Sequence, residues 1–265
     1  MADPSRSVHQ HSRLPSITDS RWKAVRDETE GWGTPLLHTP GRAAAPIVTA
    51  SRRQLGIYAP SDGLRVASLP GLATAIVASP VLDGDTVYTF GYGVETPAPF
   101  APRLQRLDKN NDSRLSPDGY ADVPILNNVG RNAVNRDGVV SEDEWDIFAK
   151  RVWGPNCLMA IRMEKDGPRE LWRYDKNFTS VIPSTLAYRG VLYIVRNGGI
   201  LTTHDAGTGT VVKTGRISGA LGGYSSSPVA ADGRVWLASD EGKVSVLRAG
   251  GEWEVFAVND LNEGC

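Results

Sequence analysis

Most of the chain consists of short runs in which apolar and polar residues alternate, separated by turns rich in glycine. Alternation with a period of two is typical of β-strands with one buried face. The Asp-Gly pairs at 83–84 and 232–233 lie between such runs and predict tight hairpin turns, because glycine accepts the positive φ that these turns need. A second glycine-marked turn and a further strand follow each hairpin, as at 197–202 and 240–247. The pattern therefore predicts a chain built from consecutive antiparallel hairpins.

The hairpins recur at a regular distance. Four units begin with a proline close to a serine or threonine, at Pro35, Pro80, Pro183 and Pro228. The first two prolines are 45 residues apart, and so are the last two. The middle distance of 103 residues predicts an insertion in the second unit. Four strands in a unit of this length are typical of a β-propeller blade, which buries its faces only against neighbouring blades.

This pattern resembles the PQQ-like (quinoprotein-like) β-propeller repeat. The resemblance rests on the Ser-Pro-Val starts at 79–81 and 227–229, on the turn at 205–209, and on Trp172, which matches the blade-docking tryptophan. It implies an all-β propeller. An unrelated β-sandwich of tandem hairpins is the alternative, which the constant spacing disfavours. A WD40 propeller is disfavoured because no unit ends in Trp-Asp.

The resemblance covers residues 31–93 and 156–265 and leaves 94–155 as an insertion. About four blades are expected. Propellers of this family usually have seven or eight blades, so we expect an incomplete propeller with open blade edges. Residues 1–30 are polar and lack periodicity, which favours a disordered segment or linker.

The insertion contains two segments that resemble EF-hand calcium loops, 108–119 and 133–144. Calcium needs six or more oxygen ligands, and alternating oxygen side chains in a tight loop point inward together. The first loop offers Asp108, Asn110, Asp112, Ser116 and the backbone carbonyl of Arg114. The second offers Asn135, Asp137, Ser141, Glu144 and the backbone carbonyl of Val139.

Both loops depart from the EF-hand pattern. The first has Ser113 in the place of the usual glycine and Gly119 in the place of the bidentate glutamate; the second has Ala133 in the place of the first aspartate. We therefore expect weak calcium binding. Leu115 and Val140 hold the apolar position of each loop. The alternative is a pair of loops that keeps its shape through their packing and binds no metal.

Ser141 and Glu144 also predict a capping box at the start of a helix. Two other groups of residues contain side chains of catalytic types, but neither predicts an active site. His204 and Asp205 are expected in a solvated turn. The serines 225–227 lack a nucleophile elbow and are expected to start a strand near the propeller axis.

Composition and charge narrow the function classes. The net charge of −1 gives no electrostatic indication of a nucleic-acid partner. No apolar run is long enough for a transmembrane segment, and the first residues lack the apolar core of a signal peptide. Cys157 and Cys265 are far apart in the sequence. Quinoprotein dehydrogenases use adjacent cysteines over the cofactor, so PQQ is not expected.

The sequence thus favours a non-enzymatic propeller scaffold or interaction module with an inserted pair of calcium loops. The expected partner is a protein or glycan on a propeller face, and open blade edges favour self-association. The alternative is a fragment of a quinoprotein-type oxidoreductase. A third hypothesis is an outer-membrane assembly propeller, and no residue of the sequence favours it over the others. The family resemblance implies a periplasmic or extracellular location.

Overall fold

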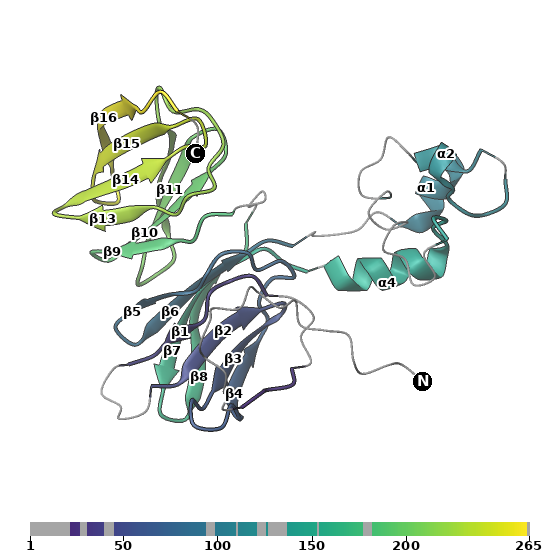
Figure 1. Ribbon diagram of the computed structural model, residues 1–265, viewed down its shortest axis with the longest axis horizontal. Helices are drawn as coiled ribbons and strands as arrows, with labels where there is room; N and C mark the ends of the chain where they lie inside the picture. Colours follow the sequence, from purple (N-terminus) through teal and green to yellow (C-terminus); the bar gives the residue numbers. More distant parts are fainter. Residues whose placement is uncertain are drawn as a thin grey trace, which may run out of the picture.

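The computed structural model describes residues 22–26, 31–39, 45–93, 99–109, 111–120, 126, 137–152, 154–176 and 182–263. Its strands form four sheets, each with four antiparallel strands in sequential order (Figure 1). Blade 1 contains β1 (Leu36–Leu37), β2 (Ile47–Ser51), β3 (Gln54–Tyr58) and β4 (Arg65–Pro70). Blade 2 contains β5 (Val81–Asp83), β6 (Thr86–Gly91), β7 (Cys157–Glu164) and β8 (Gly167–Tyr174). Blade 3 contains β9 (Leu186–Tyr188), β10 (Val191–Arg196), β11 (Ile200–Asp205) and β12 (Val211–Arg216). Blade 4 contains β13 (Val229–Ala231), β14 (Arg234–Ala238), β15 (Lys243–Arg248) and β16 (Glu254–Asp260).

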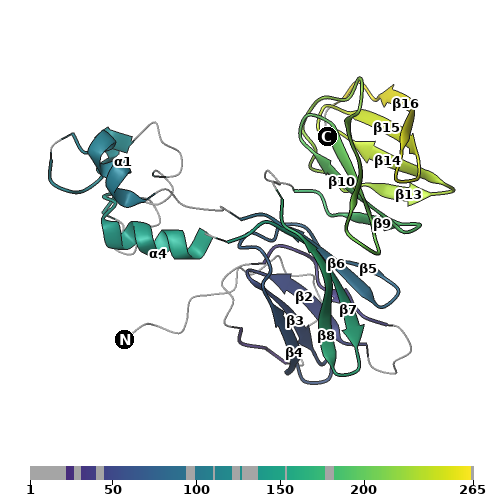
Figure 2. The same ribbon diagram turned by 180° about the vertical axis from the view of Figure 1, so that it is seen from behind.

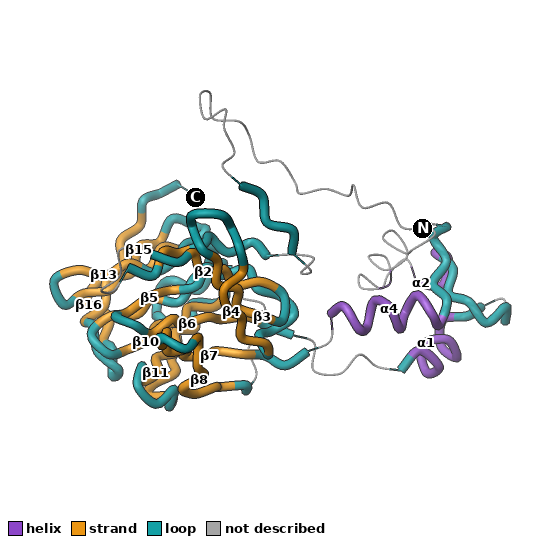
Figure 3. The backbone as a smooth tube through the Cα atoms, turned by 90° about the horizontal axis from the view of Figure 1, so that it is seen from below, coloured by secondary structure: helices purple, strands orange, loops and turns teal. Residues whose placement is uncertain are grey.

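The helices lie between β6 and β7, within the sequence of blade 2. Those that the structure describes are α1 (Phe100–Leu107), α2 (Pro117–Tyr120) and α4 (Glu142–Val152). Figures 2 and 3 show them to one side, apart from the four sheets. The insertion therefore replaces the short connection between the second and third strands that the other blades have.

The four sheets share one irregularity. In every blade the pairing of the third strand with the fourth shifts register at one point. The shifts lie at Ile57/Tyr58, Ala160/Ile161, Thr203/His204 and Val246/Leu247. A β-bulge bends its strand and increases the local twist. Its recurrence shows that the sheets are copies of one unit, and the predicted all-β propeller class is confirmed.

Side chains that alternate along the central strands fill the spaces between blades. In β7, Cys157, Met159 and Ile161 lie in an apolar cluster with blade 1, while Leu158 and Ala160 lie in a cluster with blade 3. All of these residues are fully buried. Successive side chains of a strand point to opposite faces of the sheet, so one strand supplies both interfaces.

The same alternation holds in blade 3. Leu192 and Ile194 of β10 pack toward blade 2, and Tyr193 and Val195 pack toward blade 4. Within the residues that the structure describes, the three clusters join blade 1 to 2, 2 to 3 and 3 to 4. The core of this molecule therefore lies between the sheets.

A ladder of hydrogen bonds links the starts of consecutive blades. The backbone N–H of Thr34 donates to the Ser79 hydroxyl (2.8 Å), and that of Ser79 donates to the Ser184 hydroxyl (3.0 Å). The N–H of Ser184 donates to the Ser227 hydroxyl (2.9 Å). Each residue lies just before the first strand of its blade. The expected place of the serine cluster, at the start of a strand, is thus confirmed for Ser227.

The ladder corrects one part of the predicted repeat. Pro35, Pro80 and Pro228 directly precede the first strand of their blades, but Pro183 lies three positions before β9. Thr185 holds the equivalent position and is buried. The hydroxyl of the preceding residue makes the contact between blades, so the ladder does not depend on proline at the next position.

We predict that Ser184→Ala lowers the free energy of unfolding by about 1 kcal/mol, because the N–H of Ser79 loses its acceptor. Urea unfolding measures this change. The neighbouring exposed Ser226→Ala is the control and is expected to leave stability unchanged within about 0.5 kcal/mol. Equal effects of the two substitutions would show that the ladder does not stabilise the fold.

Candidate functional site: the paired loops of the insertion

The two loops of the insertion meet through a short β-bridge. Leu115 and Val140 exchange both backbone hydrogen bonds, at 3.1 and 2.8 Å. Both side chains are fully buried. These are the two apolar positions that the sequence pairs, and their expected packing is observed.

A separate small core supports this bridge. Its buried members are Phe100, Leu115, Tyr120, Leu126, Val140 and Trp145. The Trp145 ring also packs against Phe148, with ring centroids 5.8 Å apart, and the Arg103 guanidinium lies 4.6 Å from its centroid. The described core of the insertion contains no residue of the blades, so the loops are held together by their own helices.

In the first loop, carboxylates turn toward the loop's own backbone. Asp108 accepts hydrogen bonds from the N–H of Asp112 (3.3 Å) and of Ser113 (3.0 Å). Asp112 accepts one from the N–H of Arg114 (2.8 Å). Ser113 has φ of +61°, the left-handed region that glycine adopts at lowest cost. The loop therefore keeps its sharp turn without the usual glycine.

The second loop leads directly into α4. Asp137 accepts a hydrogen bond from the N–H of Val139 (2.8 Å), and Gly138 has φ of +80°. The N–H of Ser141 donates to Glu144 (3.0 Å), and the N–H of Glu144 approaches the Ser141 hydroxyl at 3.4 Å. This is the predicted capping box, and it is confirmed.

Several predicted ligands cannot be placed together. Asn110 and Asn135 lie outside the described residues. The carbonyl oxygen of Ser116 accepts hydrogen bonds from the N–H groups of Gly119 and Tyr120, which places Ser116 at the start of α2. Among the described residues, no group of three or more acidic, histidine or cysteine side chains is placed to hold a metal ion. The calcium ligands therefore stay a prediction.

The structure explains why the first loop ends in glycine. A Cβ atom at Gly119 would lie 2.2 Å from the carbonyl oxygen of Leu107. That oxygen belongs to the backbone of α1 and cannot move aside as a flexible side chain would. The missing glutamate thus follows from the close approach of α1 and α2, a constraint that the sequence motif does not reveal.

We predict that Gly119→Glu destabilises the insertion, although it restores the EF-hand residue. The clash with α1 should lower the free energy of unfolding by about 2 kcal/mol. Thermal unfolding with and without calcium measures this effect. A variant that is as stable as the wild type and binds calcium more tightly would contradict this account of Gly119.

The ends of the insertion are clamped to the junction of blades 1 and 2. The N–H of Gly93 donates to the Asn156 side chain (3.2 Å), and Ala75 and Tyr92 exchange backbone hydrogen bonds. A Cβ atom at Gly93 would lie 2.0 Å from the carbonyl oxygen of Gly154. The two glycines allow the outgoing and returning chains to touch, so the insertion joins the propeller through a narrow stem.

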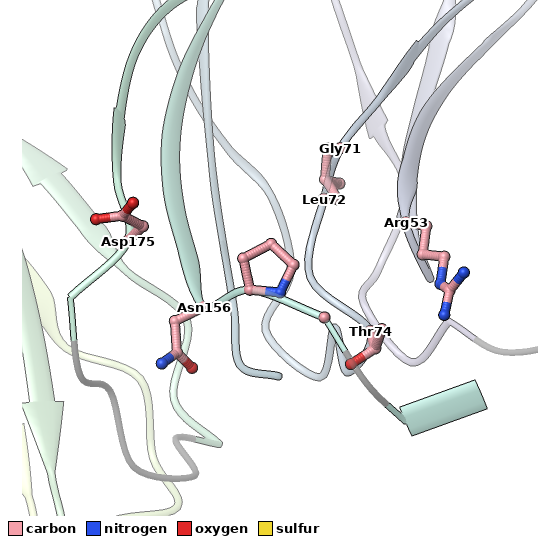
Figure 4. Close-up of a pocket in the computed structure, with 8 residues that line it drawn as sticks. Arg53, Gly71, Leu72, Thr74, Asn156 and Asp175 are labelled. Carbon is pink, nitrogen blue, oxygen red and sulfur yellow. The ribbon is translucent and has the colours of Figure 1, made fainter. Parts of the chain in front are cut away.

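A cavity of about 610 Å³ lies beside this stem. Figure 4 shows Arg53 and Asp175 on opposite sides of it, with Thr74 and Asn156 between them. Its walls come from the β2–β3 turn, from the connection between blades 1 and 2, from the stem, and from the end of β8. The cavity therefore opens on the propeller face that carries the insertion.

His204 differs from its predicted setting. Its side chain is fully buried, with Nδ1 3.0 Å from the carbonyl oxygen of Gly209 and the ring edge-on to Tyr174. Burial lowers the pKa of the His204 imidazole. Asp205 is exposed, and hydrogen bonds from the hydroxyl and N–H of Thr208 lower the pKa of its carboxylate. The solvated turn is thus confirmed for Asp205 and wrong for His204, which faces the interface between blades 2 and 3.

Cys157 is also buried between two blades. It lies in the core between blades 1 and 2, and its sulfur accepts a hydrogen bond from the N–H of Ala73 (3.2 Å). Burial raises the pKa of the thiol to about 11. The thiolate is the reactive form of cysteine, so this residue packs as an apolar side chain. Cys265 lies outside the described residues.

No family model and no curated protein matches this chain. Solved structures that resemble it include BamB from Moraxella catarrhalis, with 12% identity over 92% of this chain and a TM-score of 0.42. Sqt1 from Saccharomyces cerevisiae has 9% identity over 82% and a TM-score of 0.49. A europium-containing methanol dehydrogenase has 14% identity over 41% and a TM-score of 0.28. The chain spans 68%, 48% and 20% of those three chains. Similarities this low carry no functional argument, so the blade assignment rests on the strand topology.

No helix among the described residues has the length and apolar character to cross a membrane.

Proposed function

We propose that the protein is a non-enzymatic β-propeller interaction module whose inserted loops bind calcium weakly. The observation that carries this proposal is the bridge between Leu115 and Val140, because it pairs the two loops back to back. Loop pairing through this position brings the oxygen-rich segments on either side of the bridge into one unit. A segment that served only as a spacer would not need this pairing.

The donor chemistry of the loops fits a hard cation in part. The second loop would use Asp137, Ser141, Glu144 and the Val139 carbonyl, with Asn135 as its first side-chain ligand. The first loop would use Asp108, Asn110, Asp112, Ser116 and the Arg114 carbonyl. Calcium takes six to eight oxygens, and each loop lacks one carboxylate of the full pattern. We therefore propose affinity in the millimolar range, about 10⁻³ M, as for extracellular calcium modules.

The stem connects the insertion to the propeller beside the 610 Å³ cavity. α4 ends at Val152, and the chain then passes through Gly154, Pro155 and Asn156, which line the 610 Å³ cavity. Because α4 ends two positions before Gly154, we propose that a change in the insertion alters this cavity. We propose that a protein or glycan partner binds the propeller face at this cavity. The proposed location is periplasmic or extracellular, where free calcium is high enough to occupy a weak site.

Calorimetry with calcium tests the metal proposal. The wild type is expected to bind with a dissociation constant of about 1 mM. Glu144→Gln keeps the capping box, since glutamine serves that role, but removes a charged ligand. It should weaken binding about tenfold, which corresponds to about 1.4 kcal/mol. Glu142→Gln removes an exposed charge from the same helix end and should leave binding almost unchanged.

The absence of heat up to about 10 mM calcium would remove the metal proposal. Equal weakening by Glu142→Gln and Glu144→Gln would show a general electrostatic effect in place of a ligand. For the non-enzymatic part, PQQ and a dye acceptor are added to the full chain. Turnover of alcohols or sugars would overturn it.

A further inference from the structure

The contact between blades 2 and 3 depends on an indole. Trp172 of β8 reaches the turn that follows β11, and its Nε1–H donates to the carbonyl oxygen of Ala206 (3.0 Å). Its ring lies against Gly209, where a Cβ atom would be 2.5 Å from the ring. The outermost strand of one blade thus docks a tryptophan on the bare backbone of the next.

Blade 1 receives a second indole in the same way. Trp22 donates from Nε1–H to the carbonyl oxygen of Pro60 (2.9 Å), and its ring lies against Gly63. A Cβ atom at Gly63 would be 2.2 Å from that ring. The residue that supplies this indole precedes all four blades in the sequence.

The two receiving turns have the same backbone. In blade 3, the N–H of Asp205 donates to Thr210 and that of Gly209 donates back to Asp205, at 2.9 and 2.8 Å. In blade 1, Ala59 pairs with Leu64 and Gly63 with Ala59 in the same pattern, both at 2.9 Å. The two glycines have φ of +76° and +73°. The turn at 59–63 is therefore a copy of a turn that recognises tryptophan between blades.

Residues 22–26 also lie beside the outer face of blade 1. Tyr58 lies on the face of β3 that points away from blade 2, and yet it is only 5% exposed. A cavity of about 520 Å³ lies between residues 23–26 and a wall formed by Tyr58 and residues 62–65. The segment thus stands where the outer strand of a preceding blade would stand, but residues 22–26 form no strand.

We propose that the turn at 59–63 is a docking site for an extended segment that carries a tryptophan, and that Trp22 of this chain occupies it. The indole ring fills the space above a glycine, and its N–H pairs with a backbone carbonyl. Lys23 and Arg26 of the segment border the same cavity as Asp62 and Arg65 of blade 1, so the contacts of the indole define the site. Without strand pairing to hold it, the segment can exchange with the same sequence supplied in trans.

A dye-labelled peptide with the sequence of residues 20–27 tests this site by fluorescence anisotropy on the full chain. The Trp22→Ala variant should bind the peptide, because its own segment no longer competes. Binding to the wild type should be at least about tenfold weaker, since a tethered segment acts at millimolar effective concentration. The peptide with alanine in place of tryptophan should not bind the variant.

Two controls separate docking from general loosening. Adding Gly63→Ala to Trp22→Ala should abolish peptide binding, because the new Cβ fills the space of the indole. Trp32→Ala removes an exposed tryptophan and should bind the peptide no better than the wild type, since Trp22 still occupies its turn. If Trp22→Ala does not fold, Trp22→Phe keeps a ring but loses the Nε1–H donor. It should bind the peptide about fivefold more tightly than the wild type, from the loss of one hydrogen bond.

Failure of the peptide to bind a folded Trp22→Ala or Trp22→Phe variant would overturn the proposal. Binding that survives Gly63→Ala would also overturn it, because the peptide would then sit elsewhere. Neither result depends on calcium, so this site and the calcium loops can fail independently.

Discussion

Burial of both faces of the central strands is the constraint on which this structure depends. A strand such as β7 places Met159 toward blade 1 and Leu158 toward blade 3, and both are fully buried. One sheet alone would leave half of these side chains in water, at a cost of about 2 kcal/mol for each large apolar group. A blade is therefore stable only against a neighbour. The hydroxyl ladder at Ser79, Ser184 and Ser227 then sets the register between blades.

The sequence predicts well the features that recur in every blade as a result of this packing constraint. The hairpins, the four units and the interruption between β6 and β7 follow from alternation and spacing, because each blade solves the same packing problem. Prediction fails where the setting of a residue depends on a contact with a residue far away in the sequence. Pro183 does not mark the start of blade 3, which is marked by the contact of Ser184 with Ser79, and His204 is buried because Tyr174 of another blade covers it. No local pattern around Trp22 indicates that Gly63 receives it.

The insertion does not depend on packing between blades, because it has its own core. Its bridge and its buried Trp145 contact residues of the insertion, so this core forms separately from the packing between blades. The sequence motif identifies the paired positions Leu115 and Val140 correctly. It does not explain Gly119, because the reason is the carbonyl oxygen of Leu107 and not a ligand. A missing ligand in a degenerate loop can thus report packing between helices, independently of metal affinity.

The outer faces of blades 1 and 4 both carry aromatic side chains, but the two faces protect them from water in different ways. A blade face without a neighbouring blade exposes aromatic surface to water. On blade 1, Tyr58 is buried beside the segment that carries Trp22. On blade 4, Phe256 of β16 is 53% exposed, and the guanidinium groups of Arg248 and Arg234 lie 5.2 and 5.7 Å from its ring. Cation–π contacts of this kind contribute about 0.5–1 kcal/mol each at exposed sites, less than burial of an aromatic ring. Blade 4 therefore keeps the more accessible apolar surface, and blade 1 has a site with a defined geometry for one side chain.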